Sequence, residues 1–287
     1  MRSLLFIPAD SDRKLSKGAA SGADALILDL EDAVASENKP AARRMTLDYL
    51  KTGRSPEQKI VVRINALDTG LTTTDLAAIV AGKPDAVLLP KSGGGHDIRT
   101  VDNYLSALEA REGIEPGFVG IYAVATETAG AMFGLGTYAG ASPRLRGLMW
   151  GEEDLAADLG AVGNRRPDGT RSDPYRLART LCLMGSVAAG CDAVDGIYAD
   201  FRNEEAFEAE CRASVIDGFV CKAAIHPSQV PIINKVFMPS PADITYAERV
   251  VQAFAQSGTG ITSLDGRMLD RPHLRQAQKV LLRAGRV

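Results

Sequence analysis

Eight short apolar runs, separated by segments long enough for helices, constrain the fold of this chain more than any other feature. The runs are rich in Val, Ile and Leu and hardly alternate with polar residues, which is typical of parallel strands buried on both faces. They are Leu4–Pro8, Ala25–Leu30, Ile60–Ile64, Ala86–Leu89, Val119–Ala125, Leu145–Trp150, Ala193–Tyr198 and Phe219–Ile225. Eight strands alternating with helices predict an α/β fold, a closed (β/α)₈ TIM barrel.

The segments between the runs carry helix signals. Ser172–Ala189 is predicted to be a helix with Pro174 in its first turn, and Gly190 and Gly218 stand where helices would end before a strand. An open doubly wound sheet is the alternative fold, but the glycine-rich fingerprint of such sheets is missing after the first strand. The polar, turn-rich segment Gly160–Asp173 is expected to be a mobile loop near the site.

The chain continues beyond the predicted barrel, which we assign to residues 1–238. In the extension, residues 239–287, helices are predicted over Ala242–Gln256 and Pro272–Ala284, with a flexible Gly/Ser/Thr-rich stretch at Ser257–Ser263. A segment of this length is too short to build a core of its own. We therefore expect a C-terminal helical lid or an oligomer contact.

Composition excludes several classes of function. The net charge is −3, so no basic field attracts nucleic acid. The four cysteines show no CxxC spacing and the three histidines are scattered, which argues against a zinc site. The first apolar stretch, Leu4–Ile7, is too short for a signal peptide, and no run approaches the length of a membrane span. A cytoplasmic protein with no membrane partner is expected.

Charged residues follow nearly every predicted strand, at the end of the barrel where catalytic groups sit. They are Asp10, Asp29, Glu31, Asp32, Arg63, Lys91, Glu127, Glu152, Glu153, Asp154, Asp200 and His226. Carboxylates crowded around one mouth repel each other, and an all-oxygen ligand set favours Mg²⁺, with Mn²⁺ possible, over zinc. An arginine among them suits a substrate carboxylate or a developing oxyanion. These residues predict a magnesium enzyme acting on a small carboxylic acid, without naming the reaction.

A series of ordered motifs covers almost the whole chain. They are Leu5-Phe6-Ile7-Pro8-Ala9-Asp10 with Arg13 and Lys17, Leu28-Asp29-Leu30-Glu31-Asp32, Val62-Arg63-Ile64-Asn65, Leu89-Pro90-Lys91, Glu127-Thr128, Gly151-Glu152-Glu153-Asp154-Leu155, Ile225-His226-Pro227-Ser228-Gln229 and Met268-Leu269-Asp270-Arg271-Pro272. With these motifs the chain resembles the family of citrate lyase β subunits and malyl-CoA or citramalyl-CoA lyases.

The resemblance implies a TIM barrel that holds Mg²⁺ on the residues matching Glu127 and Asp154. For each carboxylate the alternative is an ordinary acidic residue near a helix N-terminus. Glu31 or Asp32 is expected to reach the metal through water.

The resemblance also assigns the chemistry. Arg63 matches the arginine that contacts substrate, with a simple rim ion pair as its alternative. Asp270 matches the family's catalytic aspartate, which delivers the proton. Its alternative role is to cap the last helix ahead of Pro272.

Binding of the acyl-CoA is implied at two further places. Arg13 and Lys17 match positions near the CoA phosphates, and they share one face if the segment around them is helical. Ile225 and His226 match the place where backbone groups meet the thioester arm. The family also implies a homotrimer or a hexamer. Because the tail leaves the barrel, we expect the lid to reach the site of a neighbouring subunit.

The predicted function is that of a Mg²⁺-dependent carbon–carbon lyase of the oxo-acid type. It would cleave or form a 3-hydroxyacyl-CoA such as malyl-CoA, citramalyl-CoA or citryl-CoA, with acetyl-CoA or a homologue and a 2-oxo acid as the other partners. One alternative is a citryl-thioester lyase subunit inside a citrate lyase complex. Another is a CoA-independent, metal-dependent 4-hydroxy-2-oxoacid aldolase.

Overall fold

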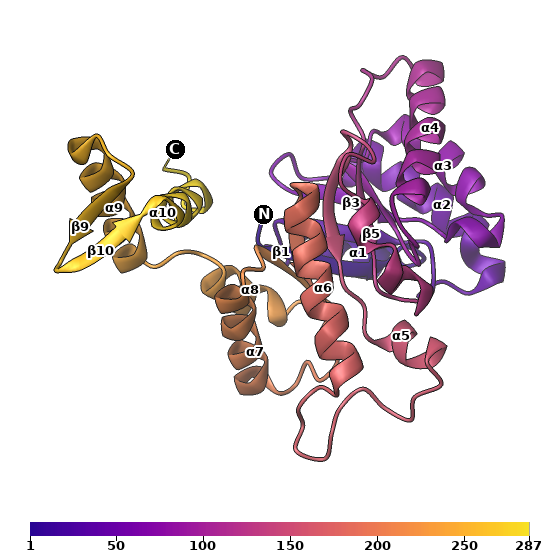
Figure 1. Ribbon diagram of the computed structural model, residues 1–287. Coiled ribbons are helices and arrows are strands. Elements are labelled where there is room, and N and C mark those ends of the chain that lie inside the picture. Colours follow the sequence, from indigo (N-terminus) through magenta and orange to yellow (C-terminus); the bar gives the residue numbers. More distant parts are fainter. Residues whose placement is uncertain (287) are drawn as a thin grey trace. The chain divides into compact units, whose positions relative to one another are not determined.

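Eight parallel strands pair in sequence order, and the first pairs with the last to close a barrel (Figure 1). The computed structural model describes residues 1–286. The strands are β1 (Ser3–Pro8), β2 (Ala25–Asp29), β3 (Lys59–Arg63), β4 (Ala86–Leu89), β5 (Gly120–Val124), β6 (Leu145–Met149), β7 (Asp192–Asp195) and β8 (Cys221–Ala224). Each of the eight predicted runs overlaps one strand, and the predicted TIM barrel is confirmed.

The apolar runs extend past the hydrogen-bonded strands at several ends. The run predicted over Phe219–Ile225 contains β8, which covers only Cys221–Ala224, yet Phe219 is fully buried. Apolar sequence reports burial, whereas a strand is defined by its hydrogen bonds, and the two do not end together. β7 stops at Asp195, and the next residue, Gly196, lies close to the backbone of Trp150.

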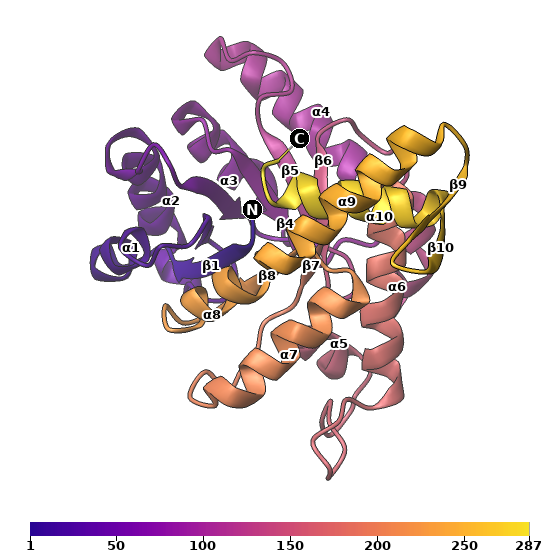
Figure 2. The ribbon, with the colours of Figure 1, turned by 90° about the vertical axis from the view of Figure 1, so that its left-hand side faces the viewer.

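The barrel interior is filled by small and branched apolar side chains from all the strands. They are Leu4, Ala25, Ile27, Val61, Ala86, Leu88, Tyr122, Val124, Met149, Val194, Cys221 and Ala223. Helices surround the strands (Figure 2). They are α1 (Asp12–Ala19), α2 (Lys39–Asp48), α3 (Thr72–Ile79), α4 (Gly95–Glu112), α5 (Glu153–Asp158), α6 (Asp173–Ala189), α7 (Glu204–Asp217) and α8 (Gln229–Val236). Among the described residues no helix is long and apolar enough to cross a membrane.

The predicted limits of α6 are confirmed. Ser172 is its N-cap, a proline lies in its first turn, and Gly190 ends it with a φ of 70°. Gly218 ends α7 in the same left-handed region, with a φ of 113°. Between α5 and α6 the chain makes a loop in which Arg165 and Arg171 form an isolated antiparallel bridge.

From Lys235 onward the chain forms a second compact unit, so the observed division lies a few residues before the predicted one at 238/239. It contains α9 (Pro241–Ser257), β9 (Ile261–Leu264), β10 (Arg267–Asp270) and α10 (Arg271–Arg283). Both predicted helices are present. The hairpin was not predicted, although Asp265 and Gly266 at its tip both have positive φ, as a tight hairpin turn requires.

The second unit also corrects the expectation that it would lack a core. Six buried apolar side chains from α9, β10 and α10 pack together there: Ala247, Val250, Phe254, Leu269, Ala277 and Leu281. The hairpin adds apolar surface that a pair of helices alone does not offer, and this surface makes a small core feasible.

Candidate active site

Arg63, the last residue of β3, is fixed by a carboxylate from the neighbouring strand. Its Nε donates to Oδ1 of Asp29 at 2.8 Å, and its Nη2 donates to Oδ2 at 2.6 Å. Parallel pairing places Asp29 beside Arg63 in register. The guanidinium also lies 5.0 Å from the centre of the Phe6 ring. Burial lowers the pKa of Arg63, but Asp29 and further carboxylates outweigh it and raise the pKa above its usual range.

Glu31 lies against two cations just beyond β2. One carboxylate oxygen is 2.9 Å from Nη1 of Arg63, and the other accepts a hydrogen bond from Nζ of Lys91. The first oxygen is buried and its contact lacks hydrogen-bond geometry. Burial raises the pKa of Glu31, and the two cations oppose that shift without cancelling it. Burial at the mouth therefore disfavours the ionised form of Glu31, despite its two cationic neighbours.

Lys91 follows β4 and bridges carboxylates from several strands. Its Nζ lies 3.4 Å from Oδ2 of Asp32 and 3.6 Å from Oδ1 of Asp154, besides its contact with Glu31. Its backbone N–H donates to Oε2 of Glu127 at 2.5 Å. Lys91 has a φ of 51°, a left-handed conformation that is uncommon outside glycine and costs about 1 kcal/mol or more. The sequence marked this lysine only as a charge after a strand and gave it no role.

Glu127 follows β5 and is 5% exposed. Gly151 leaves room for it, because a Cβ atom there would lie 3.0 Å from Cγ of Glu127. Burial, with smaller contributions from Asp154 and Glu31, raises the pKa of Glu127 to about 8, although the amide of Lys91 opposes the shift. Arg63 also opposes the shift, but it does not offset the burial of Glu127.

Asp154 lies in the first turn of α5, directly after the turn that leaves β6. Its side chain is 37% exposed, in contrast to that of Glu127. The contact with Lys91 links it to the carboxylates of β2. Glu127 and Asp154 thus reach the mouth from adjacent strands, one buried and one open to solvent.

The donor set can be tested against the predicted magnesium ion. Five carboxylates gather at the mouth: Asp29, Glu31, Asp32, Glu127 and Asp154. Two cationic side chains, Arg63 and Lys91, pair with them, so negative charge is in excess. The described residues hold no preformed cluster of three or more metal-binding side chains. Mg²⁺ needs only one or two protein carboxylates and keeps water or substrate oxygens elsewhere, so Glu127 and Asp154 fit it.

The residues predicted to contact CoA lie at two other places. Arg13 and Lys17 are both exposed on α1, one turn apart. After β8, the amides of Ile225 and His226 both donate to Oε1 of Gln229. The ring of His226 stacks on Phe201 with 4.6 Å between centroids. Since these two amides already have an acceptor, a thioester arm would have to use other atoms of this loop.

Asp270 belongs to the second compact unit, where it is the N-cap of α10. Its Oδ1 lies 2.6 Å from Nδ1 of His273, and its side chain is 46% exposed. This geometry matches the capping role weighed against catalysis. An exposed cap carboxylate remains accessible, so the predicted catalytic role stays a prediction.

Two family models match the chain. Residues 2–227 match the model for HpcH/HpaI aldolase/citrate lyase, and residues 178–286 match one for carbon–carbon bond lyases of the TIM-barrel fold. The chain belongs to the HpcH/HpaI aldolase/citrate lyase family. The resemblance predicted from the motifs is confirmed, and this is a family of enzymes.

Two curated relatives of the family align over nearly the full length. The chain is 38% identical over 290 residues to a (3S)-malyl-CoA thioesterase of Cereibacter sphaeroides (strain KD131), covering 99% of this chain and 94% of the relative. It is 35% identical over 286 residues to citrate lyase subunit beta of Escherichia coli (strain K12), covering 99% and 93%.

A solved structure of a family member has the same fold. Protein CitE from Mycobacterium tuberculosis, in complex with magnesium, acetoacetate and coenzyme A, superposes with a TM-score of 0.79 at 36% identity. The alignment covers 99% of this chain and 98% of that protein. A citrate lyase beta subunit from Mycobacterium tuberculosis, 36% identical to this chain, has been solved in complex with oxaloacetate and magnesium.

Proposed function

We propose that the protein is a Mg²⁺-dependent lyase that cleaves or forms the carbon–carbon bond of a 3-hydroxyacyl-CoA. The observation that carries this proposal is Glu127, a buried carboxylate with a pKa raised to about 8. Such a group is costly to keep unless a cation binds to it, and nearby Glu31 and Asp154 add to that cost. The related CitE protein was crystallised with magnesium and coenzyme A, which supports both ligands here.

Glu127 and Asp154 would hold the metal, with Glu31 or Asp32 reaching it through water. When bound, Mg²⁺ acts as a Lewis acid on the oxygens of the oxo-acid portion. Mn²⁺ has similar ligand preferences and is a substitute.

Arg63 would stabilise the negative charge that develops on the thioester fragment. Its contacts with Asp29 use one N–H of Nε and one of Nη2, which leaves further N–H groups on its terminal nitrogens. Because Asp29 fixes the plane of the guanidinium, Arg63 pays little entropy when it binds an anion.

A proton must reach the carbon that leaves the broken bond. The electron pair of that bond stays on the thioester fragment, whose carbon takes a proton from Asp270. The hydroxyl of the other fragment becomes the oxo group and releases its proton to water. Once they held Mg²⁺, Glu127 and Asp154 would be ionised and therefore poor acids at neutral pH. Asp270 stands apart from them in sequence and is half-exposed.

The CoA portion would be held by Arg13 and Lys17 near its phosphates and by the Ile225–His226 segment near its thioester arm. The amides of that segment donate to Gln229, so the proposal needs their carbonyls or a rearrangement of Gln229. A homotrimer or hexamer, in which the unit with Asp270 serves a neighbouring subunit, completes this proposal.

A second candidate is hydrolysis of the thioester bond of a malyl-CoA. It is favoured by the identity to the malyl-CoA thioesterase, which at 38% is higher than that to the citrate lyase subunit. The two reactions give different products. Hydrolysis releases free CoA and a hydroxy acid, whereas carbon–carbon cleavage releases an acyl-CoA and a 2-oxo acid.

The deciding experiment incubates the isolated chain with malyl-, citramalyl- and citryl-CoA, with Mg²⁺ or with a chelator. A thiol reagent measures free CoA, and phenylhydrazine measures the 2-oxo acid. We expect Mg²⁺-dependent 2-oxo acid without free thiol. Free thiol without 2-oxo acid would establish the hydrolase. Free 4-hydroxy-2-oxo acids tested without CoA address the aldolase alternative, and gel filtration with the same assay addresses a larger citrate lyase complex.

A further inference from the structure

The only tryptophan of the chain is held at the end of β6, just before the turn that leads to Asp154. Trp150 is 1% exposed, and its Nε1 donates to Oδ1 of Asp195 at 2.6 Å. The guanidinium of Arg171 lies 4.9 Å from the centre of the indole. Gly196 makes room, because a Cβ atom there would lie 3.0 Å from the indole nitrogen. Trp150 is thus fixed by β7 and by the loop that carries Arg171.

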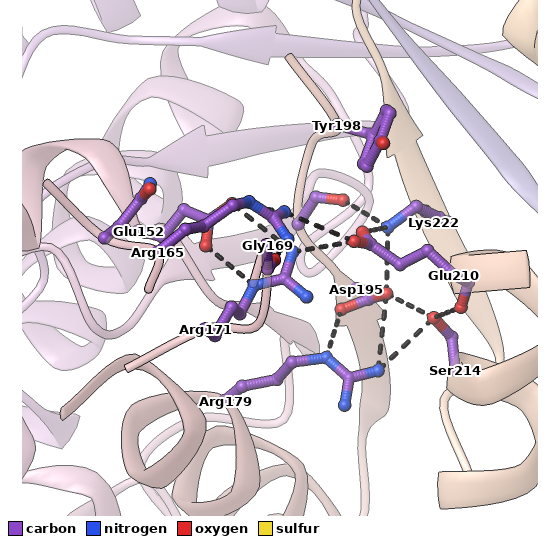
Figure 3. Close-up of polar contacts among 12 residues, drawn as sticks. Glu152, Arg165, Gly169, Arg171, Arg179, Asp195, Tyr198, Glu210, Ser214 and Lys222 are labelled. Atoms are coloured by element: carbon purple, nitrogen blue, oxygen red, sulfur yellow. Dashed lines mark hydrogen bonds and ion pairs between the residues drawn. The ribbon is translucent and has the colours of Figure 1, made fainter. Parts of the chain in front are cut away.

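Arg171 also holds the turn itself, through Glu152. Its Nε donates to Oε2 of Glu152 at 2.7 Å and its Nη2 donates to Oε1 at 3.3 Å, a bidentate pair (Figure 3). Glu152 is 6% exposed, and Arg165 lies 3.8 Å away as a second, looser partner. A buried bidentate pair fixes orientation as well as distance.

Arg171 is in turn anchored by a ring of contacts, which we call the Trp150 ring. Its Nη2 lies 3.0 Å from Oε2 of Glu210, whose other oxygen accepts from Nζ of Lys222 at 3.0 Å. Lys222 donates to Oδ2 of Asp195 at 2.9 Å, and Asp195 returns to Trp150. Figure 3 shows Arg171, Glu210, Lys222 and Asp195 pointing toward one another. Each member therefore has at least two partners.

We propose that Arg171 is a positioning residue for the metal site, acting through Glu152 and Trp150 on the turn that presents Asp154. The proposal rests on the function proposed above. The helix that begins with this turn, α5, has only six residues, and so short a helix does not stabilise itself. The position of Asp154 is consequently set from outside the helix, and Arg171 contacts the residues on both sides of Gly151.

The test replaces Arg171 and measures Mg²⁺ binding by calorimetry. Arg171→Met keeps the apolar stem and removes the fork, and it should raise the Kd for Mg²⁺ about 10–100-fold, as loss of an indirect support does in metal sites. Arg171→Lys keeps the charge without the fork and should recover part of that loss. The matched control is Arg166→Met on the same loop, whose partner Asp173 is exposed, and it should leave the Kd unchanged.

A second readout does not depend on the metal. Hydrogen exchange of the amides from Gly151 to Leu155, and the emission of Trp150, should change in metal-free Arg171→Met but not in Arg166→Met. If Arg171→Met fails to fold, Glu152→Gln takes its place and should show the same exchange and the same rise in Kd.

The outcomes separate the two proposals. Wild-type protein that binds no Mg²⁺ overturns the proposed function, while faster exchange in Arg171→Met would still show that Arg171 holds the turn from Gly151 to Leu155. Wild-type exchange and wild-type Kd in folded Arg171→Met overturn the positioning role and leave the proposed function in place.

Discussion

Two clusters of charged side chains in the barrel differ in their ratio of anionic to cationic groups. At the mouth, five carboxylates face two cationic partners, and the pKa values of both Glu127 and Glu31 are raised. In the Trp150 ring every carboxylate has a cation, and the pKa values of Asp195 and Glu210 are lowered although burial acts in the opposite direction. Glu127 and Glu31 are largely buried, as are Asp195 and Glu210, so the surrounding charges make the difference.

This difference shows that the unfavourable electrostatic interactions of the barrel are concentrated at the mouth. A balanced buried network stabilises one conformation, and it loses much when one member is removed. An unbalanced cluster destabilises the metal-free protein and leaves a free energy that a bound cation recovers. The mouth is therefore expected to be sensitive in function and tolerant in stability, whereas substitutions in the Trp150 ring are expected to lower stability.

The sharpest test of the comparison is Glu127→Gln. We expect Mg²⁺ binding to disappear and turnover to fall at least about a thousandfold, because the metal is worth several kcal/mol of barrier. Thermal unfolding should show no loss of stability, since glutamine resembles the protonated side chain that metal-free protein favours near pH 7. Near-normal turnover with normal Mg²⁺ affinity would mean that the metal site lies elsewhere. Asp154→Asn tests the second proposed metal ligand in the same way.

Asp270→Asn extends the comparison to the second unit. Loss of a proton-transfer group should lower kcat by roughly 10²–10⁴-fold. Asparagine caps a helix about as well as aspartate, so the melting temperature and Mg²⁺ binding should not change. Wild-type turnover in this variant would leave Asp270 as a helix cap only.

Lys222→Met probes the balanced cluster. Lys222 is fully buried between Asp195 and Glu210, and removing one partner of such a pair costs about 3–5 kcal/mol. Urea unfolding measures this loss. The control is Lys59→Met, whose pair with Asp85 is exposed and should matter by less than about 1 kcal/mol. Equal losses in the two variants would contradict the contrast between the clusters.

Arg63→Lys tests the cation of the mouth. The charge is kept but the planar fork on Asp29 is lost, so we expect kcat/KM to fall about 10–100-fold, the worth of a charge-assisted hydrogen bond. Steady-state kinetics with the best thioester measures this change. An unchanged kcat/KM would show that Arg63 is a rim charge and does not contact the substrate.

The smallest predicted effect is the pH dependence of Mg²⁺ affinity. Below pH about 8 a proton must leave Glu127 before the metal binds, so affinity should rise up to about tenfold per pH unit and level off above 8. Calorimetry in buffers of different ionisation enthalpy measures that proton.

The raised pKa of Glu127 also makes the stability of the metal-free protein depend on pH. Between the usual carboxyl range and pH 8 the folded, metal-free chain binds the proton of Glu127 more tightly than the unfolded chain does. Metal-free stability should therefore fall as pH rises through this window. Affinity that is flat from pH 6 to 9 would indicate that Glu127 is already ionised without metal.

The barrel could be predicted from the sequence because each strand is an apolar run with its own turn signals. The strand assignment also predicted that Arg63, Glu31 and Glu127 lie near one another, because residues that follow parallel strands share one end of a barrel. Lys91 was also among the charged residues predicted at this end. Its left-handed backbone and its hydrogen bond to Glu127 could not be predicted from the sequence.

Other features depend on contacts that no local pattern reports. Arg171 is one of several arginines in a polar loop, and only the fold brings it to Trp150 and Glu152. The core of the second unit was missed for a different reason. Asp265-Gly266 is a hairpin signal, but the neighbouring glycine, serine and threonine residues favoured a flexible stretch, so the packed hairpin went unpredicted.

Lys91 joins loops from opposite sides of the mouth with a single residue. Its backbone amide binds Glu127 after β5, and its ammonium binds Glu31 and Asp32 after β2 and Asp154 after β6. Substitutions at any of these carboxylates will consequently change the environment of the others through Lys91. For anyone redirecting this barrel to a new substrate, mutations at these positions will be epistatic, and Lys91 is the residue to keep constant while the others are varied.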